Sequence, residues 1–209
     1  MDVARPISTV IPGLAGPILQ VLARTERPLT GSAIAALIGH HDASRAGVNK
    51  ALKSLITGGL VQCQPAGRAN LYTLNRQHLA APAIIALSDL RSALIERMRV
   101  LVESWSLQPV AAWMFGSAAR GDGDASSDID VLLVRSDRID PDNATWAAQA
   151  AALVEHIHLV TGNRCELLEY SAGELTALAR RRDPIIDSLR NDAITIVGPP
   201  VRALVTLGP

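Results

Sequence analysis

Residues 110–134 read VAAWMFGSAARGDGDASSDIDVLLV, and this stretch decides the expected fold of the second half of the chain. Val110–Phe115 is apolar and strand-like, and it ends in a turn at Gly116 and Ser117. Ten residues separate Ser117 from the segment 128–134, which begins Asp-Ile-Asp and continues as an apolar strand. The predicted order is strand, Gly-Ser turn, spacer and acidic strand.

The two aspartates of the second strand are predicted to act as a pair. Alternation along a strand places Asp128 and Asp130 on one face and the apolar Ile129 on the other. Two carboxylates held close together repel each other unless a cation lies between them, and hard divalent cations prefer oxygen ligands. Gly116 permits close backbone approach, and the hydroxyl and amides around Ser117 can receive phosphate oxygens. We therefore expect phosphate and metal to meet at this turn.

This arrangement resembles the nucleotidyltransferase superfamily that includes DNA polymerase beta, especially its small members called minimal nucleotidyltransferases. Their pattern is a hydrophobic residue, Gly, Gly or Ser, a spacer, and then acid, hydrophobic, acid, hydrophobic. Phe115-Gly116-Ser117 and Asp128-Ile129-Asp130-Val131 match every fixed position. The resemblance covers about residues 85–198 and implies a mixed sheet flanked by helices. A Gly-Ser turn beside a salt-bridged strand is the alternative interpretation.

The family also uses a third acid on a later strand. Residues 142–160 are predicted to form a helix, and residues 164–170 the next strand. Glu166 lies between two apolar residues, as the family's third acid does, while Glu169 would face the opposite way and is the second choice. The resemblance implies two magnesium ions bound by Asp128, Asp130 and Glu166, with an NTP as substrate. Arg120 is expected to neutralise triphosphate charge, or to be a surface residue of the spacer.

The first part of the chain predicts helices and a hairpin. Apolar spacing indicates a helix within residues 12–25, and Thr30 and Ser44 are candidate N-caps of two further helices ending at Gly39 and Gly58. Residues 60–64 and 71–74 then predict paired strands around a turn that contains Gly67. His40 and His41 have no partner at metal or triad spacing.

This order resembles a winged helix-turn-helix domain of bacterial transcriptional regulators, over about residues 12–76. The resemblance implies that residues 44–55 form the recognition helix and that DNA is a partner. The candidate DNA-facing residues are polar or basic: Ser44, Arg45, Asn49, Lys50 and Lys53, with Arg68 and Asn70 on the wing. The alternative is a solvated face on a domain that binds only protein.

A long helix over residues 81–105 is expected to join the two modules, because Leu94, Met98 and Trp105 continue an apolar stripe. The fold class is therefore α+β, with a winged helix-turn-helix domain at 1–80 and the connecting helix and nucleotidyltransferase domain at 81–209. The stripe suits core packing and is also compatible with a homodimer.

Charge and composition agree with two modules. Residues 1–80 contain eight Lys or Arg and three Asp or Glu, whereas residues 81–209 contain twelve and seventeen. A basic module suits a polyanion partner, and an acidic one suits bound cations. Two isolated cysteines indicate neither a disulfide framework nor a zinc site. No apolar run is long enough to span a membrane, so we expect a soluble cytoplasmic protein.

The leading hypothesis is a metal-dependent enzyme that moves a nucleoside monophosphate from NTP to an unidentified acceptor (protein, RNA or small molecule), coupled to a DNA-binding module. The alternative is a transcriptional regulator whose second domain is a nucleotide sensor or is inactive. A toxin of a toxin-antitoxin pair is a third option that the family resemblance permits.

Overall fold

The computed structural model describes residues 1–39 and 44–205, and His40 and His41 lie outside these ranges. Its contacts divide the chain into two compact units. The N-terminal unit is Arg5–Arg91, and the C-terminal unit joins Met1–Ala4 to Ser92–Pro209.

The first unit extends beyond residue 80 because its last helix packs into its own core. Ile84 is 4% exposed within that core, and the backbone carbonyl of Ser88 accepts a 3.1 Å hydrogen bond from Arg24.

The prediction of one continuous helix over residues 81–105 is wrong. The chain forms α4 (Ala81–Ser88) and α5 (Leu90–Glu103), and Asp89 between them has φ −107° and ψ 11°. Aspartate is a poor helix-interior residue because its side chain competes for nearby backbone groups. The two helices also serve different cores, since Ile84 is buried in the N-terminal unit and Met98 in the C-terminal unit.

The N-terminal unit contains helices followed by a hairpin, as expected. Its elements are η1 (Pro6–Thr9), α1 (Ala15–Ala23), β1 (Leu29–Thr30), α2 (Gly31–Ile38), α3 (Arg45–Thr57), β2 (Val61–Ala66), β3 (Ala69–Leu74) and α4. The strands form an antiparallel sheet in the order β1-β3-β2. Thr30 and Ser44 cap α2 and α3 by accepting backbone N–H bonds, which confirms both predicted caps.

The C-terminal unit is built on a four-stranded mixed sheet with the order β6-β5-β4-β7. Its elements are α5, β4 (Ala111–Phe115), α6 (Gly116–Arg120), β5 (Ile129–Arg135), α7 (Ala144–Thr161), β6 (Cys165–Ser171), α8 (Ala172–Arg180), α9 (Pro184–Asp192), β7 (Ile194–Val197) and α10 (Val201–Leu204). β4 is antiparallel to β5 and β7, while β5 and β6 are parallel. The α+β class with a mixed sheet flanked by helices is confirmed.

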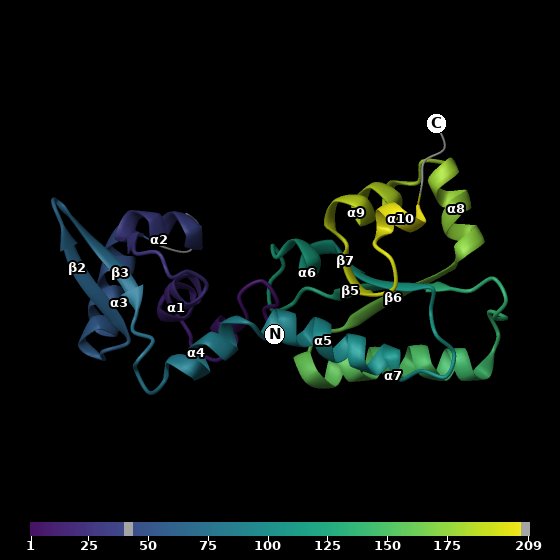
Figure 1. The fold of residues 1–209 in the computed structure, drawn as a ribbon, viewed down its shortest axis with the longest axis horizontal. Coiled ribbons are helices and arrows are strands. Elements are labelled where there is room, and N and C mark those ends of the chain that lie inside the picture. Colours follow the sequence, from purple (N-terminus) through teal and green to yellow (C-terminus); the bar gives the residue numbers. More distant parts are fainter. Residues whose placement is uncertain (40–43, 206–209) are drawn as a thin grey trace. The chain divides into compact units, whose positions relative to one another are not determined.

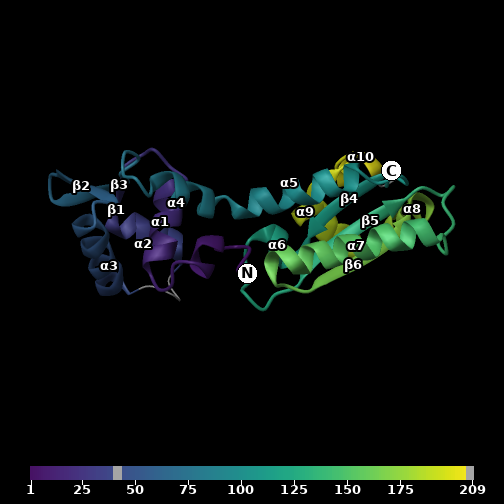
Figure 2. The same cartoon turned by 90° about the horizontal axis from the view of Figure 1, so that it is seen from below.

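Helices cover both faces of this sheet (Figures 1 and 2). On one face, Met114, Val131 and Leu133 pack in a cluster with residues of α5 and α7. On the other, Trp113 and Leu132 pack with residues of α8, α9 and α10. Alternation along β5 therefore assigns Ile129 and Val131 to the face of α5 and α7, and leaves Asp130 on the face of α8 and α9.

Over the described ranges, none of the helices combines the length and the apolar character needed to cross a membrane.

Candidate functional site

The strand register brings Asp130 and Glu166 together. Asp130 is paired with Phe115 of β4 on one side and with Glu166 of the parallel strand β6 on the other. Side chains that are paired in register project from the same face of a sheet. Asp128 precedes Asp130 by two residues, immediately before β5, so alternation points it to this face as well. Three carboxylates thus lie on one face of the sheet, at the end where β5 and β6 begin.

The three carboxylates concentrate negative charge at this end of the sheet, and that charge shifts the pKa of neighbouring groups. Partial burial raises the pKa of Asp130, the charges of Glu166 and Asp128 raise it further, and Arg120 acts in the opposite direction. Burial, together with the charges of the same three carboxylates, raises the pKa of the Cys165 thiol to about 12. The negative charges of these carboxylates therefore act on one another and on Cys165.

Gly116 fits against the carboxylate of Asp130. Gly116 has φ +68°, and a Cβ atom added there would lie 2.1 Å from Oδ2 of Asp130. Any side chain at this position would displace the aspartate and would also strain the backbone. The glycine of the predicted turn is thus required by Asp130 itself, which the sequence pattern alone did not reveal.

The spacer between the turn and the acidic strand is ordered by its own polar groups. Oδ1 of Asp124 accepts hydrogen bonds from the backbone N–H of Ser126 and from the hydroxyls of Ser126 and Ser127. Gly123 lies beside the hydroxyls of Ser117 and Ser127, since a Cβ atom there would be 3.0 Å and 3.1 Å from them. The spacer therefore folds back over Ser117, which is half-buried.

Asn163 holds the end of this spacer and was missed as a site residue. Its side chain is buried, and Nδ2 donates to the backbone carbonyl of Ser127 at 2.9 Å and more weakly to that of Ala125 at 3.4 Å. Asn163 therefore positions the residue that immediately precedes Asp128. In the sequence, Gly162 and Asn163 indicate only the end of a helix, and nothing in the chain signals a contact across 36 residues.

Arg120 lies near the carboxylates but is already paired. Its guanidinium donates to Asp122 and to Asp192 at 2.9 Å each, and these bonds raise its pKa. The side chain is 43% exposed, so these ion pairs contribute little to stability. Asp192, at the end of α9, is a second residue that the sequence did not indicate. A triphosphate would have to share or replace the two carboxylate partners of Arg120.

Glu169 faces the opposite side of the sheet from Asp130. Its carboxylate accepts a hydrogen bond from Nε1 of Trp146, a buried residue of α7. Glu169 is paired in register with Leu133, which packs on the face of α5 and α7. Glu166 is thus the residue of this pair that shares a face with Asp130.

The carboxylates fit a divalent cation by donor type and by charge. Over residues 1–39 and 44–205, no three Asp, Glu, His or Cys side chains stand close enough together to hold a metal ion in their present positions. Asp128, Asp130 and Glu166 nevertheless offer only oxygen ligands, which magnesium prefers.

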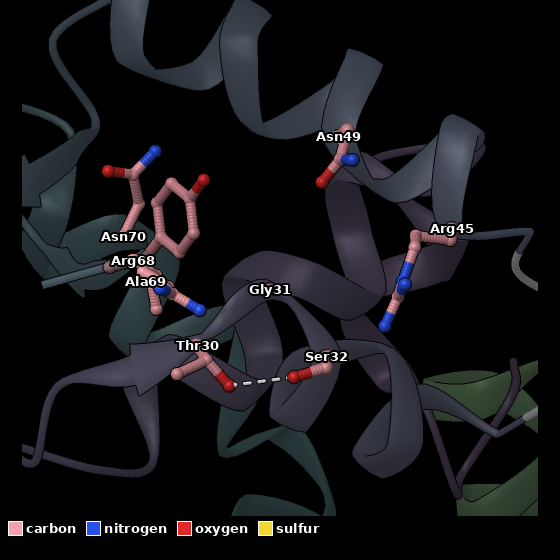
Figure 3. Close-up of a pocket in the computed structure, with 9 residues that line it drawn as sticks. Thr30, Gly31, Ser32, Arg45, Asn49, Arg68, Ala69 and Asn70 are labelled. Atoms are coloured by element: carbon pink, nitrogen blue, oxygen red, sulfur yellow. Dashed lines mark hydrogen bonds between the residues drawn. The ribbon is translucent and has the colours of Figure 1, made fainter.

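In the N-terminal unit, several of the predicted DNA-facing residues line one hollow. Figure 3 shows Arg45 and Asn49 of α3 across from Arg68 and Asn70 of the β2–β3 hairpin. The hollow has a volume of about 460 Å³. Thr30 and Ser32, whose hydroxyls are 3.0 Å apart, also line it and were not predicted. Three polar or basic segments therefore surround a single open cavity.

The other predicted residues of α3 lie outside the lining of this hollow. Lys50 and Lys53 are exposed on α3, on the solvent side of the helix. Ser44 is exposed, and its hydroxyl accepts the N–H of Gly47 at 3.0 Å. The hydroxyl of Ser44 is therefore already engaged as a helix cap.

Comparison with known proteins finds a family match within the C-terminal unit. The family model for the nucleotidyltransferase domain matches residues 95–160, a stretch that contains Gly116, Ser117, Asp128 and Asp130 and ends before Glu166. This segment is therefore similar to nucleotidyltransferase domains, and the similarity covers about a third of the chain. No curated protein matches the chain significantly.

Solved structures give only low similarity. The DNA recognition and protein interaction domains of HOP2 match with 28% identity, 30% coverage of this chain, 100% of that chain and a TM-score of 0.29. A toxin-antitoxin complex with AMP-PNP matches with 16% identity and a TM-score of 0.34, and the match covers 50% of this chain and 73% of that chain. TrmBL2, an archaeal chromatin protein, matches with 15% identity and a TM-score of 0.30, and the match covers 90% of this chain and 77% of that chain. These scores are too low to indicate a shared fold.

Proposed function

We propose that the C-terminal unit is a metal-dependent nucleotidyltransferase that moves a nucleoside monophosphate from NTP to an acceptor. The observation that carries this proposal is the fit of Gly116 against Asp130, with Glu166 in register on the neighbouring strand. The nucleotidyltransferase family match over residues 95–160 supports it.

In the proposed reaction, an acceptor hydroxyl oxygen bonds to the α-phosphorus of the NTP. The bond from that phosphorus to the bridging oxygen of the β-phosphate breaks, and pyrophosphate leaves. Glu166 would complete the second metal site or take the acceptor proton, and the Ser117 hydroxyl and nearby amides would hold the terminal phosphates. Asp128, Asp130 and Glu166 would hold two magnesium ions, which supply charge neutralisation for the triphosphate and activation of the hydroxyl.

The N-terminal unit is proposed to be a winged helix-turn-helix module that binds DNA through α3 and the β2–β3 hairpin. Its order of helices and its β1-β3-β2 sheet support this assignment. Arg45 and Lys50 are exposed on α3, and Arg68 is exposed on the hairpin. Contacts to phosphates from such residues supply most of the affinity of DNA-binding proteins.

A second candidate function is a DNA-binding regulator whose C-terminal unit binds nucleotide without turnover. The positions of the acidic side chains favour this function, because among the residues that the structure describes no three Asp, Glu, His or Cys side chains stand close enough together to hold a catalytic metal ion.

Release of labelled pyrophosphate from each of the four NTPs with magnesium tests the enzyme. The wild type should be compared with the Asp128→Asn, Asp130→Asn double variant over a panel of protein, RNA and small-molecule acceptors. Asp187→Asn is the matched control, because Asp187 is an exposed carboxylate on α9. Turnover that disappears only in the double variant supports the enzyme, whereas NTP binding with no turnover on any acceptor favours the sensor.

DNA binding has a separate test. Affinity for duplex DNA should fall steeply with salt, and Arg45→Ala with Lys50→Ala should weaken binding and flatten that dependence. Arg97→Ala, which removes an exposed arginine of α5 in the other unit, is the control and should bind as the wild type does. Unchanged binding by the α3 double variant would rule out α3 as the recognition helix.

A further inference from the structure

The turn between α8 and α9 presents three consecutive arginines that the proposed reaction does not use. Arg180 ends α8, and Arg181 and Arg182 follow it before α9 begins at Pro184. All three side chains are exposed. Within the described ranges, no carboxylate forms an ion pair with any of them. The nearest acid in sequence, Asp183, caps α9 by accepting the N–H of Ile185 at 3.0 Å.

The backbone of this turn would ordinarily carry a glycine. The N–H of Arg182 donates to the carbonyl of Ala179, and that of Asp183 donates to the carbonyl of Leu178. These two bonds form the helix-ending motif in which the residue at the position of Arg182 adopts a left-handed conformation. Arg182 has φ 56° and is the one non-glycine residue with positive φ in the described part of the chain.

A helix C-terminus attracts positive charge, which accounts for Arg180 in the last turn. It does not account for an arginine at the left-handed position, where glycine makes the same turn without strain. The fold therefore retains a charged side chain at a position where a smaller residue would be more stable. Strain of this kind is a reason to look for a binding role.

α9 connects the turn to the candidate active site. It begins next to the arginines and ends at Asp192, whose carboxylate contacts Arg120 at 2.9 Å. Nine helical residues at 1.5 Å each span about 14 Å. Both α8 and α9 pack on the face of the sheet that carries Asp130, and Figure 1 shows them together on that side. About four nucleotides of a strand, at 3.4 Å of helical rise each, cover the same distance.

We propose that Arg180, Arg181 and Arg182 bind the phosphate backbone of a polynucleotide acceptor about four nucleotides from its reacting end. This inference rests on the proposed transfer reaction and specifies its acceptor class. The terminal hydroxyl of the strand lies at the carboxylates and bonds to the α-phosphorus of the NTP. Pyrophosphate leaves, and the hydroxyl proton passes to Glu166 or to water. Guanidinium groups suit this role because they pair with phosphate oxygens at fixed geometry.

The test measures fluorescence anisotropy of a labelled single-stranded oligonucleotide with the full chain, without NTP or magnesium. Every protein carries Arg45→Ala and Lys50→Ala, so that the proposed DNA-binding surface of α3 contributes little. RNA and DNA oligonucleotides of the same sequence distinguish the two sources of a phosphate backbone, since a site that contacts the 2′-hydroxyl prefers RNA.

Three phosphate contacts to a single strand predict that affinity falls about 20-fold between 50 and 200 mM salt. Arg182→Gly should reduce this dependence to about 7-fold, because it removes one contact. The same variant should keep a melting temperature equal to or above that of its parent, since glycine relieves the left-handed strain. Arg97→Ala should change neither quantity, because Arg97 belongs to α5, which packs on the opposite face of the sheet.

A triple variant adds Arg180→Ala and Arg181→Ala to Arg182→Gly. The inference is overturned if oligonucleotide affinity and its salt dependence are unchanged in both the single and the triple variant, even if NMP transfer to a protein is found. Reduced binding in both variants supports the inference. If binding requires the arginines but the wild type transfers nothing to either oligonucleotide, the phosphate-binding surface stands and the transferase proposal fails.

Discussion

Replacing Gly116 by alanine should disable the candidate site, and Gly162→Ala provides its matched control. Both glycines have positive φ, +68° and +75°, so alanine incurs a similar left-handed strain of about 1–2 kcal/mol at each. Their surroundings differ. A Cβ atom at position 116 would lie 2.1 Å from Oδ2 of Asp130, whereas at position 162 it would meet nothing within 4 Å.

The difference between the two variants isolates the contact with Asp130. A carbon and an oxygen in contact need more than 3 Å, so the carboxylate must move by about 1 Å, and overpacking of this kind costs about 1–3 kcal/mol. We therefore expect Gly116→Ala to lower the free energy of unfolding by about 2–5 kcal/mol, and Gly162→Ala by about 1–2 kcal/mol. A shift of 1 Å in a reacting group can also reduce turnover about 100-fold.

Denaturation followed by tryptophan fluorescence suits this comparison. Trp105, Trp113 and Trp146 are the tryptophans of the chain, and all three are buried in the C-terminal unit. The signal therefore reports unfolding of the unit that contains both glycines. Pyrophosphate release by the folded proteins gives the second readout. Equal destabilisation by the two substitutions, with turnover retained in Gly116→Ala, would refute a role for Gly116 in seating the Asp130 carboxylate.

Four further predictions concern groups in and around the three carboxylates. The pKa of Asp130 is raised in the folded protein, so the protein loses stability as the pH rises above the pKa of this carboxyl in the unfolded chain. Asp130→Asn should therefore raise the denaturant midpoint of unfolding at pH 7 in EDTA, and this gain in stability should disappear in acid. A lower midpoint for the variant at pH 7 would contradict the prediction. The pKa of Asp124 is lowered by hydrogen bonds with two serines, so its stabilisation is present at neutral pH and lost in acid; Asp124→Ala should lower the midpoint at pH 7. Because its pKa is near 12, Cys165 should react with maleimide at pH 8 far more slowly than the exposed Cys63, as peptide mass spectrometry would measure; equal rates would be inconsistent with its burial. Asn163→Leu should destabilise the C-terminal unit by about 1–3 kcal/mol, because the carbonyl of Ser127 loses its donor; unchanged fluorescence unfolding would argue against that bond.

Local sequence signals predicted the elements and the pair of aspartates well. The Gly-Ser turn at Gly116 and the alternation of Asp128 and Asp130 depend on short-range geometry, which residue types specify directly. The preference for Glu166 came from the family resemblance. Alternation predicted that Glu169 faces the opposite way, and the bond from Trp146 to Glu169 agrees with that orientation.

Features that depend on distant contacts could not be predicted. Asn163 reaches Ser127 across 36 residues, and Asp192 reaches Arg120 across 72. Neither pairing follows from periodicity or from the properties of single residues. The break at Asp89 was missed for a similar reason, because the apolar spacing continues through it while the residues on either side pack into different cores. Tertiary packing overrode the local helix signal there.

The C-terminal unit is discontinuous in the chain, and this affects how the protein can be dissected. Val3 is 4% exposed and packs in the cluster that contains Leu94, Met98 and Val102. A recombinant fragment that begins at Ser92 would leave an unfilled space where the valine side chain belongs. A fragment of residues 5–91 keeps every residue of its own unit. The two halves are therefore not equally suited to separate expression, and a peptide that supplies residues 1–4 in trans would be the natural way to restore the longer one.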